Sequence, residues 1–258
     1  MITRDLCCQR CARRPVFFRV LLLTLLLSLM VGWLPAAQAE SPPSQRRFGV
    51  ATNSNPLDYA NYGALHTGWY QNWGPCPWGM QALEGIEFYP MVGGFKDIYI
   101  VETEAELRSY ISQCPECYPD GAIWIVANEP DFDYYSKKNG EPIAARLITS
   151  EEYAQKYHYY YQAIKSINPT YRVAIAATMG TFLYGTRRAY ERLYSQKMPI
   201  DVYNMHCYMY VDGHNPNADI LKQVKSQVGH KRQMMKDYGD RHKWLIITEI
   251  GALWNPGA

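Results

Sequence analysis

The chain has 258 residues, of which 48% are hydrophobic and 19% are charged, and its formal net charge is +2. This length fits one large α/β domain better than two small ones, and the composition is that of a globular protein rather than a disordered one. Nucleic-acid binding needs a clustered basic face, and the sequence contains no such cluster outside the N-terminal segment.

Residues 1–39 have the features of a secretory signal peptide. Five arginines precede or enter the apolar run Val20–Leu34, and Ala37-Gln38-Ala39 offers a small-residue cleavage site. The run is shorter than the roughly 20 residues of a membrane-spanning helix. We therefore expect cleavage and a secreted, periplasmic or extracellular protein, and an uncleaved membrane anchor is the alternative. Without this segment the formal net charge becomes −2, and residues 40–47 form a short proline-containing linker.

Seven short segments after the linker are predicted to be strands. Each is mostly apolar along its whole length, which is typical of strands that are buried on both faces. The segments are Phe48–Thr52, His66–Tyr70, Ile86–Val92, Ala122–Ala127, Val173–Ala177, Val202–His206 and Trp244–Thr248.

Helices are predicted between several of these strands. Thr103 with Glu106, and Thr149 with Glu152, have the spacing of capping boxes, in which side chains satisfy the first free backbone N–H groups of a helix. The four predicted helices are residues 103 to about 113, Ser150 to about Ile167, Tyr184–Gln196 and Ala218–Tyr238.

The alternation of strands and helices predicts a parallel sheet with right-handed crossovers. Seven strands favour a (β/α)₈ TIM-type barrel over an open sheet, and we assign residues 48–258 to one catalytic barrel. No eighth strand follows before Ala258, and an open barrel would expose strand edges. We therefore expect a barrel truncated before its eighth strand, as a fragment or a shortened reading frame, or one closed by a partner or a swapped segment.

Four cysteines follow the signal segment: Cys76, Cys114, Cys117 and Cys207. They allow two disulfides in three connectivities, and Cys114 and Cys117 are near enough to pair locally. A zinc site at Cys114 and Cys117 is disfavoured because no second ligand pair has the required spacing. Cys207 is equally compatible with a free buried thiol. The sequence contains no phosphate loop, nucleophile elbow or zinc-protease motif, and we predict no metal and no cofactor.

Two glutamates follow strands in the predicted barrel. Glu129 lies in Asn128-Glu129-Pro130 after the fourth strand, and Glu249 follows the seventh. Strand ends meet at one face of such a barrel, where active sites lie. Glycoside cleavage needs two carboxyl groups across a sugar, about 5–5.5 Å apart for retention and about 6.5–9.5 Å apart for inversion. The alternative is a pair of glutamates in surface salt bridges.

Other candidates for the site are polar or aromatic residues at the same strand ends. His206 and Tyr208 alternate by two, so they point to one side of an extended segment. Flat aromatic rings suit the C–H faces of sugars, although both histidine and tryptophan also occur as ordinary core residues. The candidates for substrate binding are Asn128, Trp69, Asn72, Trp73, His206, Tyr208 and Trp254.

The sequence resembles a known group of enzymes at these positions. Asn128-Glu129 after the fourth strand and Glu249 after the seventh resemble clan A glycoside hydrolases. The segments 69–75 and 88–91 resemble more closely the compact β-1,3-glucanase branch that contains family 128, the alkali-sensitive-linkage-like proteins.

This resemblance implies a (β/α)₈ barrel and a retaining double displacement on a polysaccharide or oligosaccharide. Glu129 is the implied acid/base and Glu249 the nucleophile, while Asn128 would bond the sugar 2-hydroxyl. We expect a monomeric hydrolase of β-linked polysaccharide, with β-1,3-glucan as one substrate. The alternatives are a non-catalytic carbohydrate-binding barrel or inactive fragment, and an unrelated secreted α/β scaffold.

Overall fold

The computed structural model describes most of the chain beyond the predicted linker. The described residues are 48–52, 67–94, 102–131, 136–138, 141–143, 148–212 and 219–255. They all belong to the compact unit Ser41–Ala258. The predicted signal peptide and linker lie outside them. Among the described helices, none is long and apolar enough to cross a membrane.

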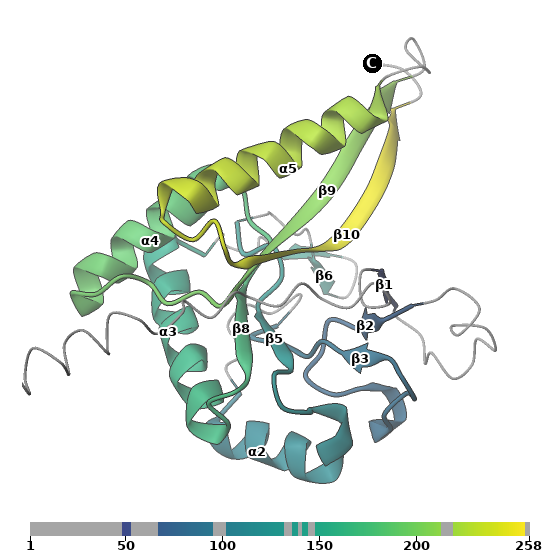
Figure 1. The fold of residues 1–258 in the computed structure, drawn as a ribbon, viewed down its shortest axis with the longest axis vertical. Coiled ribbons are helices and arrows are strands. Elements are labelled where there is room, and N and C mark those ends of the chain that lie inside the picture. Colours follow the sequence, from purple (N-terminus) through teal and green to yellow (C-terminus); the bar gives the residue numbers. More distant parts are fainter. Residues whose placement is uncertain are drawn as a thin grey trace, which may run out of the picture. The chain divides into compact units, whose positions relative to one another are not determined.

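The fold is α/β with parallel strands (Figure 1). One sheet consists of β1 (Gly49–Ala51), β2 (Trp69–Gln71) and β3 (Glu87–Phe88). The other has the order β10-β9-β8-β5-β4, and every pairing in both sheets is parallel. The spatial order of the strands therefore follows the chain, although the described strands do not close into a ring. The strands of this second sheet are β4 (Met91–Val92), β5 (Ile123–Val126), β8 (Arg172–Ile175), β9 (Val202–Asp212) and β10 (Trp244–Asn255).

The predicted third strand is divided at a proline. β3 pairs with β2, and β4 pairs with β5, so one extended segment serves both sheets. Pro90 has no N–H to donate, but its carbonyl accepts a hydrogen bond from the Ile125 backbone N–H at 2.8 Å. The Tyr89 N–H donates in the other direction, to the Tyr70 carbonyl at 2.8 Å. The break at Pro90 thus marks the change from one sheet to the other.

The positions of all seven predicted strands are confirmed, but two of the predicted ends are wrong. β9 continues six residues beyond His206, and β10 continues seven beyond Thr248. A short antiparallel hairpin of β6 (Ser136–Lys138) and β7 (Glu141–Ile143) was not predicted. Asn139-Gly140, which lies between them in the sequence, is a strong hairpin signal that could have indicated it.

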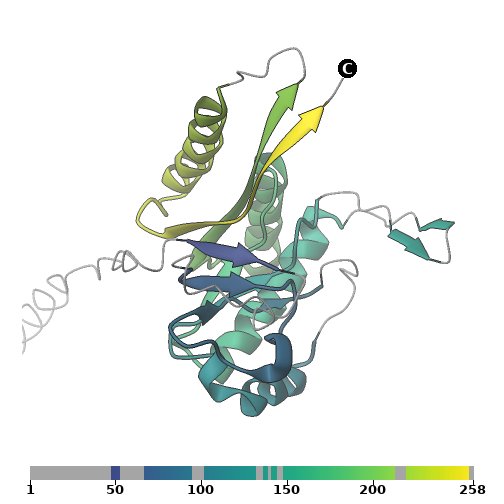
Figure 2. The ribbon, with the colours of Figure 1, turned by 90° about the vertical axis from the view of Figure 1, so that its right-hand side faces the viewer.

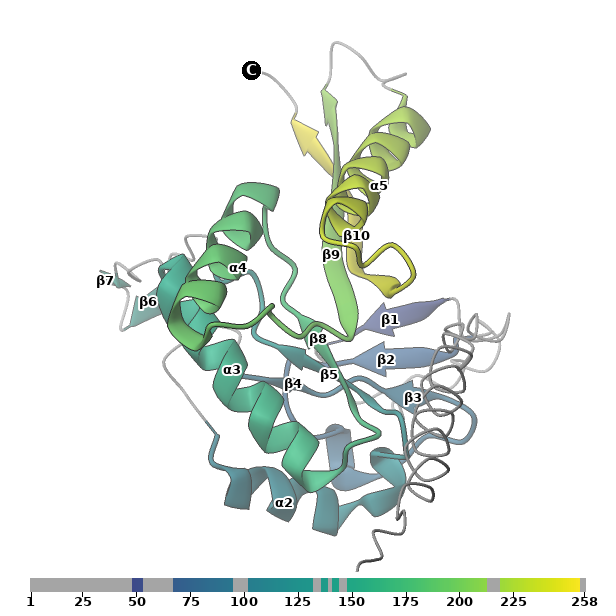
Figure 3. The ribbon, with the colours of Figure 1, turned by 60° about the vertical axis from the view of Figure 1, so that its left-hand side comes forward.

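The two capping-box helices are confirmed. They are α2 (Glu104–Gln113) and α3 (Ser150–Ile167), and both boxes are complete. The other two helices, α4 (Gly180–Tyr194) and α5 (Ile220–Asp237), also lie close to their predicted ranges. α3 packs on α4 and contacts β5 and β8, so these helices cover one face of the larger sheet (Figure 3).

The predicted local disulfide is present between Cys114 and Cys117, beside the 3₁₀ turn η5 (Pro115–Cys117). A second turn, η4, spans Trp78–Met80. Cys76 and Cys207 carry free thiols, and Cys207 is buried. The structure therefore contains one of the two disulfides that four cysteines allow.

Helix α5 covers the far part of β9 (Figure 2). Alternate residues of β9, including Cys207 and Met209, are buried in a cluster to which Val224 and Val228 of α5 contribute. Gln223 of α5 donates to the backbone carbonyl of Tyr210 and accepts from its N–H, both at 3.0 Å. The side chain of Gln223 thereby satisfies backbone groups of β9 that a neighbouring strand would otherwise bond.

A buried ion pair joins three parts of the chain. Arg187 of α4 donates from Nη1 to Tyr203 Oη of β9 at 2.6 Å, and the same nitrogen lies 3.2 Å from Asp240 Oδ2, just before β10. Tyr203 donates to the same Asp240 oxygen at 2.7 Å, and the guanidinium lies 3.3 Å from the ring centroid of Tyr238. The Arg187 and Asp240 side chains are only 1% and 2% exposed.

We predict that Arg187→Leu destabilises the fold by about 1.5–3 kcal/mol, because it removes one charged hydrogen-bond partner of the buried Asp240 carboxylate while Lys197 and Lys243 remain. Urea unfolding followed by circular dichroism would measure the loss. Arg192→Leu, which breaks the exposed pair with Glu151, should cost less than about 1 kcal/mol. Equal losses in the two variants would contradict a special role for the buried pair.

The same network predicts acid sensitivity. Burial alone would raise the pKa of Asp240, but hydrogen bonds from Lys197 and Tyr203 and the charge of Lys243 lower it to about 2. In the unfolded chain the pKa is about 3.9, so the stabilisation is complete above this pH and is lost as pH falls from about 4 to about 2. Unfolding temperatures measured between pH 5 and pH 2 should show this loss. Asp240→Asn should make the curve flatter, and parallel curves would contradict the assignment.

Candidate active site

Glu129 is positioned by an abrupt change of backbone direction at the end of β5. The strand is fully buried, but Ala127 and Glu129 have φ angles of 64° and 38°, which are unusual for residues with a Cβ. Such conformations persist only where the surroundings enforce them, and they concentrate at functional sites. The turn ends the ladder and leaves the Glu129 side chain beside His206, in the middle of β9.

The alternation of β9 sorts its side chains onto two faces. Cys207 and Met209 pack toward α5, so the intervening residues point the other way. His206 and Tyr208 therefore share the face opposite α5, as their spacing predicted. Asn204, two residues before His206, points to the same face of β9.

A β-bulge in β10 brings Glu249 beside His206. Ile247 pairs with Met205, but the next pair is Glu249 with His206, so Thr248 is the extra residue. Bulges re-aim side chains and are frequent next to active sites. The Thr248 hydroxyl donates to Asn204 Oδ1 at 2.8 Å. Glu249 consequently points to the same face as His206.

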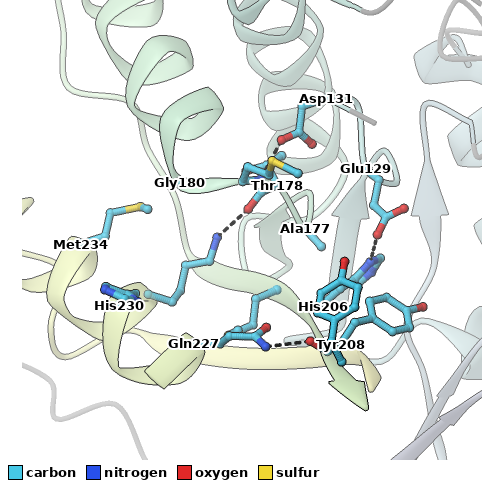
Figure 4. Close-up of a pocket in the computed structure, with 14 residues that line it drawn as sticks. Glu129, Asp131, Ala177, Thr178, Gly180, His206, Tyr208, Gln227, His230 and Met234 are labelled. Atoms are coloured by element: carbon cyan, nitrogen blue, oxygen red, sulfur yellow. Dashed lines mark hydrogen bonds and ion pairs between the residues drawn. The ribbon is translucent and has the colours of Figure 1, made fainter. Parts of the chain in front are cut away.

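Glu129, His206 and Glu249 form one cluster. One ligand atom from each side chain lies within 4.8 Å of the corresponding atoms of the other two. His206 stands between the acids: Nδ1 is hydrogen-bonded to Glu129 Oε1, and Nε2 is 3.5 Å from Glu249 Oε1. The side chains of Glu129 and Glu249 remain 21% and 15% exposed, so a ligand can reach both carboxylates. Figure 4 shows Glu129 directed toward His206.

The Glu249 carboxylate is held by two further donors. Trp73 donates from Nε1 to Oε1 at 2.9 Å, and Tyr208 donates from its hydroxyl to Oε2 at 2.5 Å. Burial, together with the bond to Glu249, raises the pKa of Tyr208, which keeps the phenol protonated and able to donate. A Cβ on Gly251 would lie 3.1 Å from the Tyr208 ring, so this glycine leaves room for the ring. These contacts fix the position of the carboxylate.

Other candidates predicted from the sequence are placed differently. Trp69 is buried among apolar side chains and stacks on Tyr89 with centroids 4.9 Å apart. Asn72 uses its side chain within its own loop, through bonds to the Cys76 carbonyl and the Gly74 N–H. Asn128 is buried beside Glu129. Trp254 lies in β10, but its side chain is outside the described residues, so its role stays a prediction.

The same three side chains are also the one cluster of potential metal ligands found among the described residues. However, both oxygens of Glu249 already accept hydrogen bonds, from Trp73 and Tyr208. Donors on both oxygens suit a carboxylate that acts on an organic substrate better than one that coordinates a cation. The prediction that no metal is needed stays a prediction.

A neighbouring cavity contains residues that were not predicted. Its lining includes Glu129, His206 and Tyr208 of the predicted site, and also Asp131 and Lys231. Figure 4 shows the residues around it. Lys231 occupies the buried side of α5, in phase with Val224, Val228 and Met235. A lysine within the apolar stripe of an amphipathic helix was the sequence signal that could have identified it.

The chain matches a family of sugar-cleaving enzymes. Residues 49–256 match the family described as the glycosyl hydrolase catalytic core. Since the match covers most of the chain, the protein belongs to this family and is a glycosidase. No sequence among the curated proteins matches.

Solved structures of family 128 enzymes share the fold. A mutant of the subgroup I endo-β-1,3-glucanase from Amycolatopsis mediterranei, with laminaritriose and laminaribiose bound, has a TM-score of 0.51 at 16% identity, covering 80% of this chain and 71% of that one. The curdlan-specific exo-β-1,3-glucanase of subgroup III from Blastomyces gilchristii has a TM-score of 0.52 at 19% identity. The match covers 82% of this chain and 78% of that one. The subgroup II endo-β-1,3-glucanase from Sorangium cellulosum has a TM-score of 0.52 at 18% identity. The match covers 82% of this chain and 76% of that one. The resemblance to family 128 is thus confirmed for the fold.

We predict that Trp73→Phe and Tyr208→Phe each lower kcat/KM by about 10- to 100-fold, because each removes a hydrogen bond to a charged carboxylate. Steady-state hydrolysis assays would measure the change, with circular dichroism to confirm folding. Trp78→Phe, at an exposed tryptophan, is the matched control and should have wild-type activity. Wild-type rates for both site variants would show that Glu249 does not depend on these donors.

Proposed function

We propose that the protein is a retaining glycosidase that cleaves β-1,3-glucan by double displacement. The observation that carries this proposal is the meeting of Glu129 and Glu249, 120 positions apart in the chain, around His206 with ligand atoms within 4.8 Å. The 4.8 Å is an upper limit for the distance between one oxygen of each carboxylate. It supports the short spacing of about 5–5.5 Å of retaining enzymes over the spacing of about 6.5–9.5 Å of inverting ones.

The proposed roles follow from the contacts of each carboxylate. Glu249, held in place by Trp73 and Tyr208, attacks the anomeric carbon and forms a covalent glycosyl-enzyme. Glu129 gives its proton to the departing glycosidic oxygen as that bond breaks. Glu129 then takes a proton from a water molecule, whose oxygen attacks the anomeric carbon and releases Glu249. His206, bonded to Glu129 through Nδ1, holds the acid in place during both steps.

The class of substrate comes from the relatives in fold. The enzymes from A. mediterranei and S. cellulosum are endo-β-1,3-glucanases, and the one from B. gilchristii is an exo-β-1,3-glucanase. A shared fold does not fix a substrate by itself. The family match together with the shared fold makes a β-1,3-linked glucan the first substrate to test.

We also propose that the seven parallel segments belong to a (β/α)₈ barrel. Two observations support it: the strands lie in chain order, and contacts cross from the first sheet to the end of the second. Gln71 of β2 donates from Nε2 to the Thr248 carbonyl of β10 at 3.4 Å, and Trp73 reaches Glu249.

Export from the cytoplasm is part of the same proposal. The disulfide between Cys114 and Cys117 supports an oxidising compartment, because such bonds persist mainly in exported proteins. The apolar N-terminal segment and its small-residue cleavage motif fit this location.

The central test is the nucleophile. Glu249→Ala should lose at least about 10³-fold in kcat, because the covalent route is closed. Added azide should restore part of the rate and give a glycosyl azide of inverted configuration, detectable by proton NMR. The substrate for this test is an aryl β-glucoside with a good leaving group.

Glu191→Ala, at an exposed glutamate of α4, is the control and should keep full activity. Undiminished hydrolysis by Glu249→Ala would refute the assignment of the nucleophile. Binding of β-1,3-glucan by the wild-type protein without release of reducing sugar would favour a non-catalytic carbohydrate-binding protein instead.

A further inference from the structure

A cavity of about 340 Å³ adjoins one of the two carboxylates. Glu129, His206 and Tyr208 line it, whereas Glu249 and Trp73 do not. It extends from Glu129 toward α5 and the segment that follows β8 (Figure 4). The two acids therefore face different surroundings: Glu129 borders the cavity, and Glu249 lies on the side of Trp73.

The cavity exists because two neighbouring strands separate. β8 ends at Ile175, and its register with β9 includes Ala174 opposite Val202, whereas β9 runs on to Asp212. Beyond this point Gln227 of α5 donates from Nε2 to the Tyr208 carbonyl at 2.8 Å. The backbone of β9 is thus satisfied from α5, and the space beside it is left open.

Two opposite charges line this space. Lys231 of α5 is 6% exposed and donates from Nζ to the Thr178 carbonyl at 3.2 Å. Asp131, two residues after Glu129, accepts a hydrogen bond from the Met179 N–H at 2.7 Å. Burial lowers the pKa of Lys231 to about 8 and raises the pKa of Asp131. Neither an anion nor a cation is strongly favoured between such groups.

The remaining lining is suited to sugar rings. Met205, Met234 and Tyr210 contribute apolar surface, and ring C–H groups of a saccharide can pack against it. The ammonium and carboxylate at the cavity wall can donate to and accept from hydroxyl groups. An uncharged saccharide matches this combination better than a uronate or an amino sugar does.

We propose that this cavity binds the departing half of the substrate, as an uncharged saccharide, and that Lys231 determines specificity there. The inference rests on the proposed function, in which Glu129 protonates the oxygen of the leaving group. The part of the chain attached to that oxygen must lie on the Glu129 side, and the cavity is on this side.

The test compares two substrates and two cavity variants. One substrate is a β-1,3-gluco-oligosaccharide of several units, whose departing half would fill the cavity. The other is a nitrophenyl glycoside, whose small leaving group needs no such site. Lys231→Met keeps the volume of the side chain and removes its charge. His230→Trp narrows the cavity from an exposed position of α5 and removes no buried hydrogen bond.

Both variants should lose about 10-fold or more in kcat/KM on the oligosaccharide. Lys231→Met removes one hydrogen bond from a charged group, and His230→Trp fills space that the oligosaccharide would occupy. Both should stay within about 3-fold of wild-type kcat/KM on the nitrophenyl glycoside, because its small leaving group does not need the cavity. A change of about 3-fold is well below the roughly tenfold loss expected on the oligosaccharide. Lys236→Met, at an exposed lysine of the same helix, is the control and should match wild type on both substrates. Equal losses on the two substrates, or no loss on either, would overturn the proposal.

A binding measurement separates this inference from the proposed function. In a Glu249→Gln background, calorimetric titration with the same oligosaccharide should show weaker binding when Lys231→Met is added. If wild type hydrolyses neither substrate, the proposed function fails, and the titration still reports on the cavity. Unchanged affinity, or tighter binding of a uronate-containing oligosaccharide than of the neutral one, would show that the cavity was misassigned.

Discussion

The site depends on the placement of His206 between two acids. Its Nδ1 atom bonds Glu129, and its Nε2 atom is 3.5 Å from Glu249. This requires β5, β9 and β10 to deliver one side chain each to the same place. Parallel pairing in chain order provides the common direction, and the pleat of β9 provides the common face.

The surrounding packing keeps these three strands in register. Arg187, Tyr203 and Asp240 connect α4, β9 and the start of β10 through buried charged contacts. Charges in such a place require partners, because an isolated buried ion is strongly unfavourable. The network lies away from the acids, so its contribution is to the arrangement of the strands that carry them.

The cavity beside Glu129 arises from the same strands. β9 is longer than β8, and α5 satisfies the part of β9 that β8 does not reach. A long strand therefore has two effects here. It extends the face that carries Tyr208, and it opens a space next to the acid.

Much of this could be predicted from the sequence. Continuous apolar runs identified all seven strands, and two Thr-x-x-Glu boxes located α2 and α3 because capping is a local interaction. Glu129 and Glu249 could be paired because parallel strand ends meet. The far halves of β9 and β10 could not be predicted in this way, since polar His206 and Glu249 interrupt the apolar runs by which strands were recognised.

Two other features depended on tertiary contacts. Trp69 and Trp73 are four positions apart, yet one packs against Tyr89 and the other bonds Glu249. Nothing local distinguishes them, because the difference comes from strands that are distant in sequence. Lys231 was overlooked for the opposite reason: its position in the apolar stripe of α5 was visible, but its neighbours Thr178 and Asp131 belong to other elements.

The bulge at Thr248 has a consequence for the changes of length that this strand can accept. Thr248 has no pairing partner in β9, so a chain that lacks it would still pair Ile247 with Met205 and Glu249 with His206. Every later residue of β10 would then keep its register with β9, and the acid would stay on the face of His206. What such a deletion would remove is the hydroxyl that donates to Asn204, together with the local bend of the strand. The extra residue therefore sets how the strand approaches the acid, whereas the pairing of the two strands does not depend on it.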